Sequence, residues 1–444
     1  MLPRCAALAL VPLIHGCATL PEVVPLIATT TGGPLPAFID ARGPVSSQRQ
    51  DEILRNLVAD GQDGMLNRQL AVVGTLAPEP LVVGNRVSLL EDGPVIDDAM
   101  LRAMDRATNH INLETFILAD DEVGHRVADM LVKKRAQGVR VNLIYDSFGS
   151  IWTPEAMFER LRNAGVRLLE FNPLNPFVAE RDWAPNTRDH RKLLVVDGAV
   201  AIIGGANIRK PEAVQGETRW RDTDIQIEGP AVARFQALFM QTWAEQGGET
   251  LCDANYFPLL PEMGDQLLKV LGGTSHTSPI FVTLLSAIMA AKQTVYLTTA
   301  YFVPDPQLLF VIESASRRGV DVQLVLPNRS DFRPALAAGR SYFQELLDAG
   351  VRIYERQDAV LHAKTAVIDG IWSTVGSTNL DRRSLLFNRE INAVMLGRSF
   401  ALRMEQLFRN DVQRSMPIEK SRWPDRPLAN RIGQWFARLF GYWW

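Results

Sequence analysis

The chain has 444 residues and a formal net charge of −3, and its composition is typical of a globular protein. With 47% hydrophobic and 22% charged residues, it is not a disordered chain, a collagen or a coiled coil. At about 150 residues per domain, the length predicts two or three domains. The balanced charge argues against a protein that coats nucleic acid, which usually has a basic excess. Three cysteines exclude a disulfide framework.

Residues 1–17 are expected to form a leader. An apolar run, Ala6–Ile14, follows a single arginine and is too short to span about 30 Å of hydrocarbon. It ends in Ile14-His-Gly-Cys17, which resembles a bacterial lipoprotein cleavage box. Two alternatives stay open: lipidation of Cys17 after cleavage, or an uncleaved hydrophobic tip.

Residues 18–79 form a lead segment, which is polar and irregular from Gly33 onward except for a helix expected over 46–57. We expect it to wrap onto the core. The domains that follow are predicted at 80–250 and 265–415, with a linker region over 245–278.

The middle of the chain contains an internal repeat. In the first copy, strands are predicted at 111–118 and 139–145, with a helix through 127–132 between them. The second copy has strands at 295–303 and 320–326 and a helix through 308–312. Gly138 and Gly319 precede the second strands and are 181 residues apart, and Gly165 and Gly350, in two Ala-Gly-Val-Arg runs, are 185 apart. The repeat predicts two duplicated α/β sandwich domains.

Each copy contains one run of chemically active residues. A His-x-Lys-x4-Asp pattern occurs twice, and an asparagine follows 17 residues after each histidine. The matched residues are His190, Lys192, Asp197 and Asn207 in the first copy and His362, Lys364, Asp369 and Asn379 in the second. Four polar identities at matched spacings indicate a functional site.

Each run is predicted to be a strand, so that its histidine and lysine project from the same face. An imidazole and an ammonium placed together need an anionic partner. If the two copies fold against each other, the two pairs and the two asparagines form a donor-rich cage suited to a phosphate diester. Two imidazoles then supply a nucleophile and a general acid/base. Nothing in the sequence implies a metal or a cofactor.

Other residues of the same types have a simpler interpretation. Asp197 and Asp369 belong to the candidate catalytic motif, but they end their strands and are expected to hold turns or to position lysine. His110, His125 and His276 are interpreted as surface or core histidines.

The duplicated motif, with Gly204-Gly-Ala-Asn and Gly376-Ser-Thr-Asn behind it, resembles the phospholipase D superfamily. Runs such as Trp220-Arg-Asp-Thr-Asp and Tyr301-Phe-Val-Pro-Asp narrow the resemblance to its bacterial cardiolipin synthase branch, over residues 80–415. The resemblance implies an α/β fold of two phospholipase D-type sandwich domains packed pseudo-symmetrically around one active site. Better-known members of that branch begin with two transmembrane helices, whereas this chain begins with the lipoprotein-like leader.

The resemblance also implies a phosphohistidine mechanism. By analogy His190 attacks the phosphorus and His362 protonates the leaving alcohol and then deprotonates the incoming one, although the order could be reversed. Family members orient each histidine with a downstream carboxylate. Asp222 lies 32 residues after His190, where Asp224 competes with it, and Glu390 lies 28 residues after His362. Asn207 and Asn379 are expected to bind or orient the substrate.

The implied substrate is a phospholipid at a membrane surface. Phosphatidylglycerol would be the donor, and a second phosphatidylglycerol or another lipid alcohol the acceptor, giving cardiolipin. The alternatives are a phospholipase D that releases phosphatidic acid, a nuclease-like phosphodiesterase, and a non-catalytic lipid-binding protein. The balanced charge and the Trp-rich tail favour lipid over nucleic acid, and no protein partner is indicated. The expected location is the bacterial cell envelope, anchored through Cys17 and facing the periplasm, or else peripheral on the cytoplasmic membrane.

Residues 416–444 form an aromatic tail. Ile432, Trp435, Phe436, Leu439 and Phe440 follow helical spacing, with arginines interspersed. Such a helix suits a lipid headgroup boundary, and the alternative is a terminal helix docked on the core.

Overall fold

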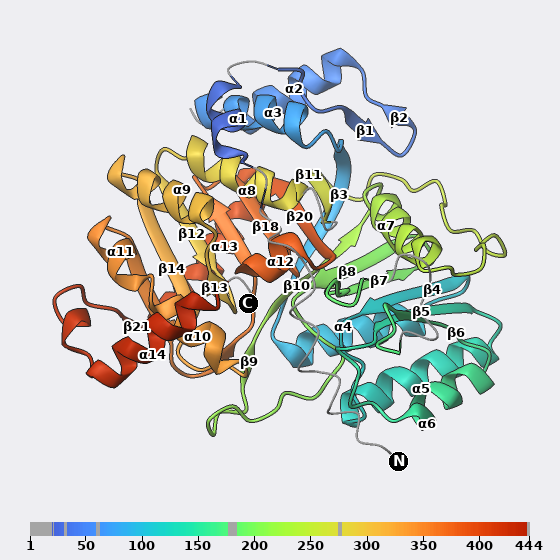
Figure 1. Cartoon of the computed structure of the whole chain (residues 1–444). Helices are drawn as coiled ribbons and strands as arrows, with labels where there is room; N and C mark the ends of the chain where they lie inside the picture. Colours follow the sequence, from blue (N-terminus) through green and yellow to red (C-terminus); the bar gives the residue numbers. More distant parts are fainter. Residues whose placement is uncertain are drawn as a thin grey trace.

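The computed structural model describes residues 20, 22–30, 33–58, 63–175, 184–273 and 278–441. The predicted leader with Cys17, His276 and the last three aromatic residues lie outside the described residues. Two copies of an α/β unit lie side by side, and the lead segment caps one end (Figure 1). Both copies contribute strands to one 17-stranded sheet.

The first copy has the strand order β6-β5-β4-β7-β8-β10-β3, in which β4, β5 and β6 are parallel and the other pairings are antiparallel. Its elements are β3 (Leu81–Glu91), α4 (Gly93–Asp105), β4 (His110–Thr115), α5 (Glu122–Ala136), β5 (Arg140–Asp146), α6 (Glu155–Asn163), β6 (Arg167–Phe171), β7 (Leu193–Val196), β8 (Val200–Gly204), β9 (Trp220–Arg221), β10 (Thr223–Glu228) and α7 (Val232–Glu245).

The second copy repeats this order as β15-β14-β12-β17-β18-β20-β11, with β12, β14 and β15 parallel. Its elements are β11 (Gln266–Gly273), α8 (Pro279–Ala290), β12 (Thr294–Thr298), β13 (Phe302–Val303), α9 (Pro306–Arg317), β14 (Asp321–Pro327), α10 (Arg333–Arg340), α11 (Phe343–Asp348), β15 (Arg352–Arg356), β16 (Val360–Leu361), β17 (Thr365–Ile368), β18 (Trp372–Gly376), β19 (Leu380–Asp381), α12 (Arg382–Leu386), β20 (Glu390–Leu396) and α13 (Arg398–Gln413). The predicted duplication is confirmed strand by strand.

The two copies join along β3, which pairs with β10 through its second part and with β11 through its first part. One buried cluster contains residues of both copies, among them Val195 and Ile225 from the first and Val375 and Ile391 from the second. Because apolar side chains of both copies are buried together, the halves share a core and their relative position is fixed by packing.

The lead segment contains α1 (Val24–Thr29), β1 (Phe38–Asp40), β2 (Gly43–Pro44), α2 (Ser47–Val58) and α3 (Asp63–Leu76). The helix predicted over 46–57 is confirmed as α2. The prediction that the rest is irregular is wrong for α3, whose Leu66, Leu70 and Val73 are buried in one cluster with Phe281 and Leu285 of α8. The lead segment therefore packs on the second copy, although it precedes the first.

Two further expectations need correction. The strand predicted over 295–303 is two strands, because the chain leaves the sheet after β12 and β13 pairs with β19 instead. The linker predicted to reach residue 278 contains β11, which lies between β20 and β3. Its Gly272 is a packing residue and not a turn residue: a Cβ there would lie 2.7 Å from Leu238 Cδ2.

After α13 the chain forms β21 (Ser415–Pro417), a short 3-10 helix, η3 (Trp423–Asp425), and α14 (Leu428–Leu439), which confirms the predicted helical spacing of the tail. Among the described residues, no helix has the length and hydrophobicity needed to cross a bilayer.

Candidate active site

The two histidines lie at equivalent points of the two copies. His190 comes just before β7 and His362 just before β17, so the strands begin one residue after each lysine and not at the histidine as predicted. Strand β7 is antiparallel to β4 with Leu193 opposite Glu114, and β17 is antiparallel to β12 with Thr365 opposite Thr298. Each histidine therefore lies beyond the carboxyl end of the first parallel strand of its copy.

Two short parallel ladders hold the histidine segments in place, and both cross between the copies. Asp189 pairs with Arg389, and the His190 N–H donates to the Arg389 carbonyl at 2.9 Å. In the symmetry-related ladder β16 pairs with β9, and the His362 N–H donates to the Arg221 carbonyl at 2.8 Å. Each histidine backbone is thus fixed against the other copy.

Because of this crossing, each carboxylate contacts the histidine of the opposite copy. His362 Nδ1 lies 2.7 Å from Asp222 Oδ2, and His190 Nδ1 lies 3.0 Å from both carboxylate oxygens of Glu390. The expectation that each carboxylate orients the histidine of its own copy is wrong. The choice of Asp222 and Glu390 as orienting residues agrees with these contacts.

Burial and surrounding charge lower the basicity of both imidazoles. Burial first, and then the positive charges of Lys192 and Lys364, hold the pKa of His190 well below its usual range. Burial and Lys364 also lower the pKa of His362, and Asp222 opposes this shift. Since charges of both copies act on His190, the two motifs form a single electrostatic site.

The pKa values of the two carboxyl groups, Glu390 and Asp222, are shifted in opposite directions. Burial raises the pKa of Glu390 to about 8, and Ser377 Oγ donates a hydrogen bond to its Oε2. Burial acts in the same direction on Asp222, but the positive charges of His362 and Lys364 outweigh it and lower the pKa of that carboxyl. Near neutral pH, Asp222 is therefore ionised, whereas Glu390 is largely protonated.

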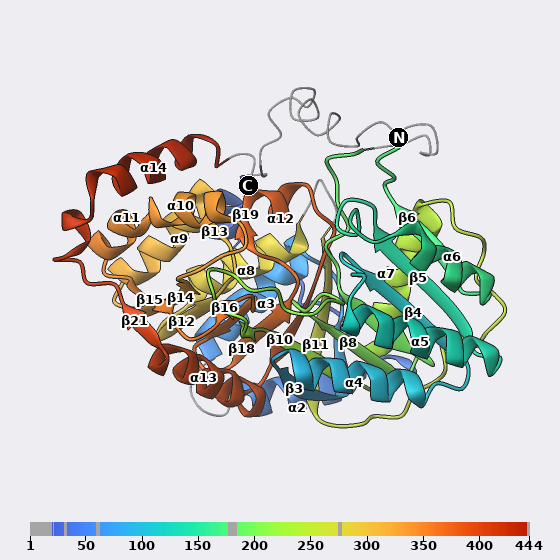
Figure 2. The ribbon, with the colours of Figure 1, turned by 90° about the horizontal axis from the view of Figure 1, so that it is seen from below.

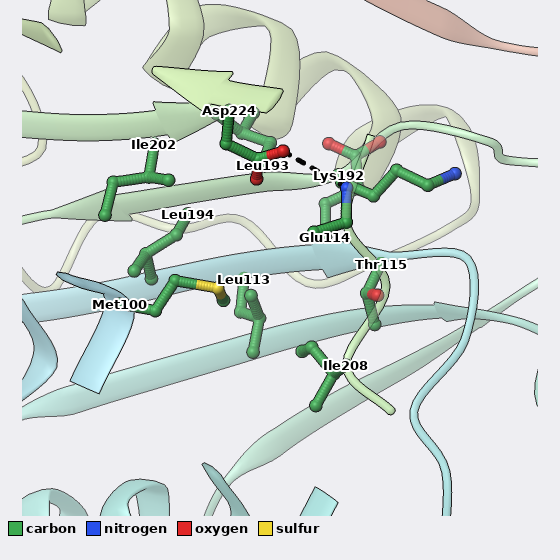
Figure 3. Close-up of a pocket in the computed structure, with 11 residues that line it drawn as sticks. Met100, Leu113, Glu114, Thr115, Lys192, Leu193, Leu194, Ile202, Ile208 and Asp224 are labelled. Carbon is green, nitrogen blue, oxygen red and sulfur yellow. Dashed lines mark hydrogen bonds between the residues drawn. The ribbon is translucent and has the colours of Figure 1, made fainter. Parts of the chain in front are cut away.

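Asp224, which competed with Asp222 in the sequence, has a different environment. Its Oδ1 accepts hydrogen bonds from the backbone N–H groups of Gly205 and Ala206 at 2.8 and 3.2 Å. Burial, together with the charge of Asp222, raises its pKa to about 8. Asp224 lies with Lys192 and Glu114 at one end of a small cavity of about 10 Å³, whose other lining is mostly apolar (Figure 3). It supports the loop after β8.

The two lysines fold back over their own motifs. Lys192 Nζ donates to the His190 carbonyl at 2.6 Å, and Lys364 Nζ donates to the His362 carbonyl. Burial lowers the pKa of Lys192 to about 7 and also lowers the pKa of Lys364. A bound phosphate would supply the anion that these buried ammonium groups need.

The two asparagines have an unsatisfied group each. Asn207 Oδ1 and Asn379 Oδ1 are buried and have no hydrogen-bond partner within the described part of the chain. An amide oxygen accepts hydrogen bonds and cannot donate one to a phosphate oxygen, so these unpaired atoms do not by themselves identify a phosphate ligand.

Asp197 and Asp369 lie at the far ends of β7 and β17 from the histidines. Asp197 accepts hydrogen bonds from the backbone N–H groups of Thr108, Asn109 and His110 at 2.8–2.9 Å. Asp369 likewise accepts from three successive N–H groups of residues 292–294 at 2.8 Å. These contacts match the expected turn-holding role and give no support to a direct role in catalysis.

The remaining described histidines have ordinary environments. His110 is buried, with its ring nitrogens near Asn109 Oδ1 at 2.9 Å and Gln236 Oε1 at 3.2 Å. His125 is exposed and pairs with Asp120 at 3.0 Å. In the described ranges, no group of three or more metal-ligating side chains is gathered at one point.

Sequence reasoning missed several residues around the histidines. The Phe116 ring packs edge-on against His190 at 5.2 Å, and Trp220 lies 5.3 Å from His362 between ring centroids. Ser377, inside the recognised Gly-Ser-Thr-Asn run, could have been identified from its place in that motif. Trp220 could likewise have been identified from the Trp220-Arg-Asp-Thr-Asp run, whereas Phe116 carries no comparable signal because it belongs neither to the repeated spacing nor to a recognised run.

Comparison with known proteins agrees with this geometry. The family described as "Cardiolipin synthase, PLD-like domain" matches residues 100–243 and 284–412. The chain is 34% identical to the cardiolipin synthase of Geobacillus thermodenitrificans over 82% of this chain and 73% of that protein. It is 33% identical to that of Alkalihalophilus pseudofirmus, again over 82% and 73%. The phosphatidylserine synthase of Haemophilus influenzae Rd KW20 has the same fold, with a TM-score of 0.63 at 14% identity over 84% of this chain and 97% of that one. With two His-Lys motifs joined in one site, the chain belongs to the cardiolipin synthase family of phospholipase D-like enzymes.

Proposed function

We propose that this protein transfers a phosphatidyl group from one phosphatidylglycerol to another, forming cardiolipin and releasing glycerol. The relatives named cardiolipin synthases support the overall reaction. The observation that carries the mechanism is the pair of buried histidines, each held at Nδ1 by a carboxylate of the other copy. This arrangement leaves the Nε2 atoms for the substrate.

In the first step His190 Nε2 attacks the phosphorus of the donor lipid. A P–N bond forms, the P–O bond to the headgroup glycerol breaks, and His362 gives its proton to the departing oxygen. The assignment of roles rests on the carboxylates. Ionised Asp222 opposes the lowering of the His362 pKa, so that His362 holds a proton more readily than His190, whose pKa is lowered further and which is the neutral nucleophile.

In the second step the acceptor hydroxyl loses its proton to His362 and attacks the phosphorus. A new P–O bond forms, the P–N bond breaks, and both histidines return to their starting states. The ammonium groups of Lys192 and Lys364, together with the side-chain NH2 groups of Asn207 and Asn379 as hydrogen-bond donors, would stabilise the charge that develops on the non-bridging phosphate oxygens.

Hydrolysis to phosphatidic acid is the second candidate, because water could replace the acceptor alcohol with the same residues. The burial of both imidazoles favours transfer, since it restricts water at the phosphohistidine. The test is to incubate the purified protein with phosphatidylglycerol vesicles and to quantify the lipid products. Cardiolipin and glycerol in equal amounts support the proposal, and phosphatidic acid as the sole lipid product contradicts it.

A phospholipid substrate implies that the enzyme works at a bacterial membrane. Attachment through a lipidated Cys17 that faces the periplasm is our first proposal for its location, and peripheral binding to the cytoplasmic membrane is the second. Labelling with radioactive palmitate separates them, because a lipidated Cys17 incorporates the fatty acid and Cys17→Ala loses the label, whereas a peripheral protein is not labelled at all.

A further inference from the structure

The terminal helix α14 is attached to the second copy through an unusual face. It packs on α10, outside the rest of the fold (Figure 2). Its buried residues are Gln434 and Ala437, and Ala437 packs against Ala335 and Ala338 of α10. Arg438 adds an ion pair to Glu345 at 2.5 Å. The helix is therefore docked through small and polar residues.

The apolar face of α14 is largely exposed, although Trp435 and Leu439 also line a cavity with Pro304, Pro306 and Tyr342 of the second copy. Trp435 is 61% exposed and Phe436 is 56% exposed, and the other exposed apolar residues of this face are Leu428, Ile432, Leu439 and Phe440. A helix stabilised by the core would bury this stripe and expose its polar one. Because the orientation is reversed, simple docking on the core does not explain the aromatic face.

The same edge of the sheet carries other exposed aromatic residues. Phe148 and Trp152 lie after the carboxyl end of β5, and Trp152 is 85% exposed. Phe332 lies after the carboxyl end of β14, the equivalent strand of the second copy. Since the catalytic histidines also lie beyond the carboxyl ends of parallel strands, the aromatic residues and the active site share one edge.

The basic residues around α14 indicate that its binding partner carries negative charge. Residues 414–441 contain six lysines and arginines and only two acidic residues, although the whole chain carries −3. Arg431 lies among the apolar residues of the helix and is exposed. Aromatic and aliphatic side chains with interspersed arginines suit the boundary between headgroups and acyl chains of an anionic bilayer.

We propose that α14 lies in the headgroup layer of an anionic phospholipid bilayer, with its exposed aromatic face inserted. The helix would hold the histidine-bearing edge of the sheet against the lipid surface. The benefit to catalysis rests on the proposed function, but binding to the bilayer does not.

The test compares the full chain with the double variant Trp435→Ser/Phe436→Ser. The matched control is Phe257→Ser, which removes an aromatic side chain that is 52% exposed. Phe257 lies far from the histidines, because its neighbour Pro258 is next to Gly198, at the end of β7 opposite to His190. In co-sedimentation with vesicles of phosphatidylglycerol and phosphatidylcholine, we expect the double variant to lose at least about tenfold in binding. The Phe257→Ser control should bind vesicles as the unaltered protein does. Added salt should weaken vesicle binding by the control and by the unaltered protein.

Two further measurements, turnover of a soluble substrate and the oligomeric state of each variant, make the outcome decisive. With a short-chain phosphatidylglycerol that is dissolved as monomers, the double variant should keep the turnover of the unaltered protein, which shows that its site is intact. Unchanged vesicle binding by the double variant, or loss of a dimer in place of vesicle binding, would overturn the proposal. If the unaltered protein binds vesicles but converts no phosphatidylglycerol, the proposed reaction fails and the docking surface stands.

Discussion

His362 and Asp222 are 140 positions apart and belong to different copies of the repeat, yet His362 Nδ1 and Asp222 Oδ2 lie 2.7 Å apart. The reciprocal pair, His190 and Glu390, spans 200 positions. In the described part of the chain, the carboxylate at Nδ1 of each motif histidine comes from the other copy. The duplication therefore produces a single site, to which each copy contributes one histidine and the carboxylate that contacts the histidine of the other copy.

Substitution of the two histidines should have different effects on a substrate whose leaving group needs no proton. With phosphatidyl-p-nitrophenol, His362→Ala should release about one equivalent of p-nitrophenol in a burst, because His190 can still attack. His190→Ala should release none. With phosphatidylglycerol both variants should be inactive, with losses of at least about 10²–10⁴-fold. Equal bursts from both variants would contradict the assigned roles.

Removal of the charge of Asp222 should affect the histidine of the other copy. In Asp222→Asn the pKa of His362 should fall, because the carboxylate that favours its charged form is lost. The pKa of His190 should change much less. Titration of isotope-labelled histidines by NMR measures both. A fall confined to His190 would show that Asp222 acts within its own copy.

Glu390 should make stability depend on pH in a defined direction. Its pKa is raised from 4.5 to about 8 in the folded protein by burial, so the folded state keeps a proton that the unfolded state loses. The contribution is fully present below pH 4.5 and is lost as the pH rises through 8. From pH 5 to pH 8.5, Glu390→Gln should therefore gain on the order of 3 kcal/mol in free energy of unfolding relative to the unaltered protein.

Urea denaturation at several pH values measures this gain. Glu159→Gln on α6, where the side chain is exposed, serves as the control and should follow the unaltered protein at every pH. A constant difference between Glu390→Gln and the unaltered protein across this pH range would be inconsistent with a protonated, buried Glu390.

The motif aspartates should matter for stability more than for chemistry. Asp197 and Asp369 hold the turns before β4 and β12 and have positive φ angles of 53° and 51°. Replacement of either by Ala removes several charge-assisted hydrogen bonds and strains the backbone, so we expect a loss of about 2–4 kcal/mol in stability. The folded fraction should turn over phosphatidylglycerol within about threefold of the unaltered rate. A loss of activity comparable with that of His362→Ala, in protein shown to be folded, would assign them to catalysis.

Much of the fold could be predicted from the sequence because its signals are local. Strand and helix spacing and the motif offsets gave the duplicated domain and the two His-Lys pairs. The exchange of Asp222 and Glu390 could not be predicted, because it depends on backbone ladders between segments far apart in the chain, such as Asp189 with Arg389. The periodicity of α14 was likewise visible, but the face by which it packs is set by α10.

The most direct test is to identify the residue that carries the phosphatidyl group. The enzyme is mixed with phosphatidylglycerol labelled at phosphorus, quenched within one turnover and digested, and the labelled peptide is sequenced. We expect an acid-labile label on His190 that is absent from His190→Ala. A label on His362, or cardiolipin formation without any labelled histidine, would contradict the proposed mechanism.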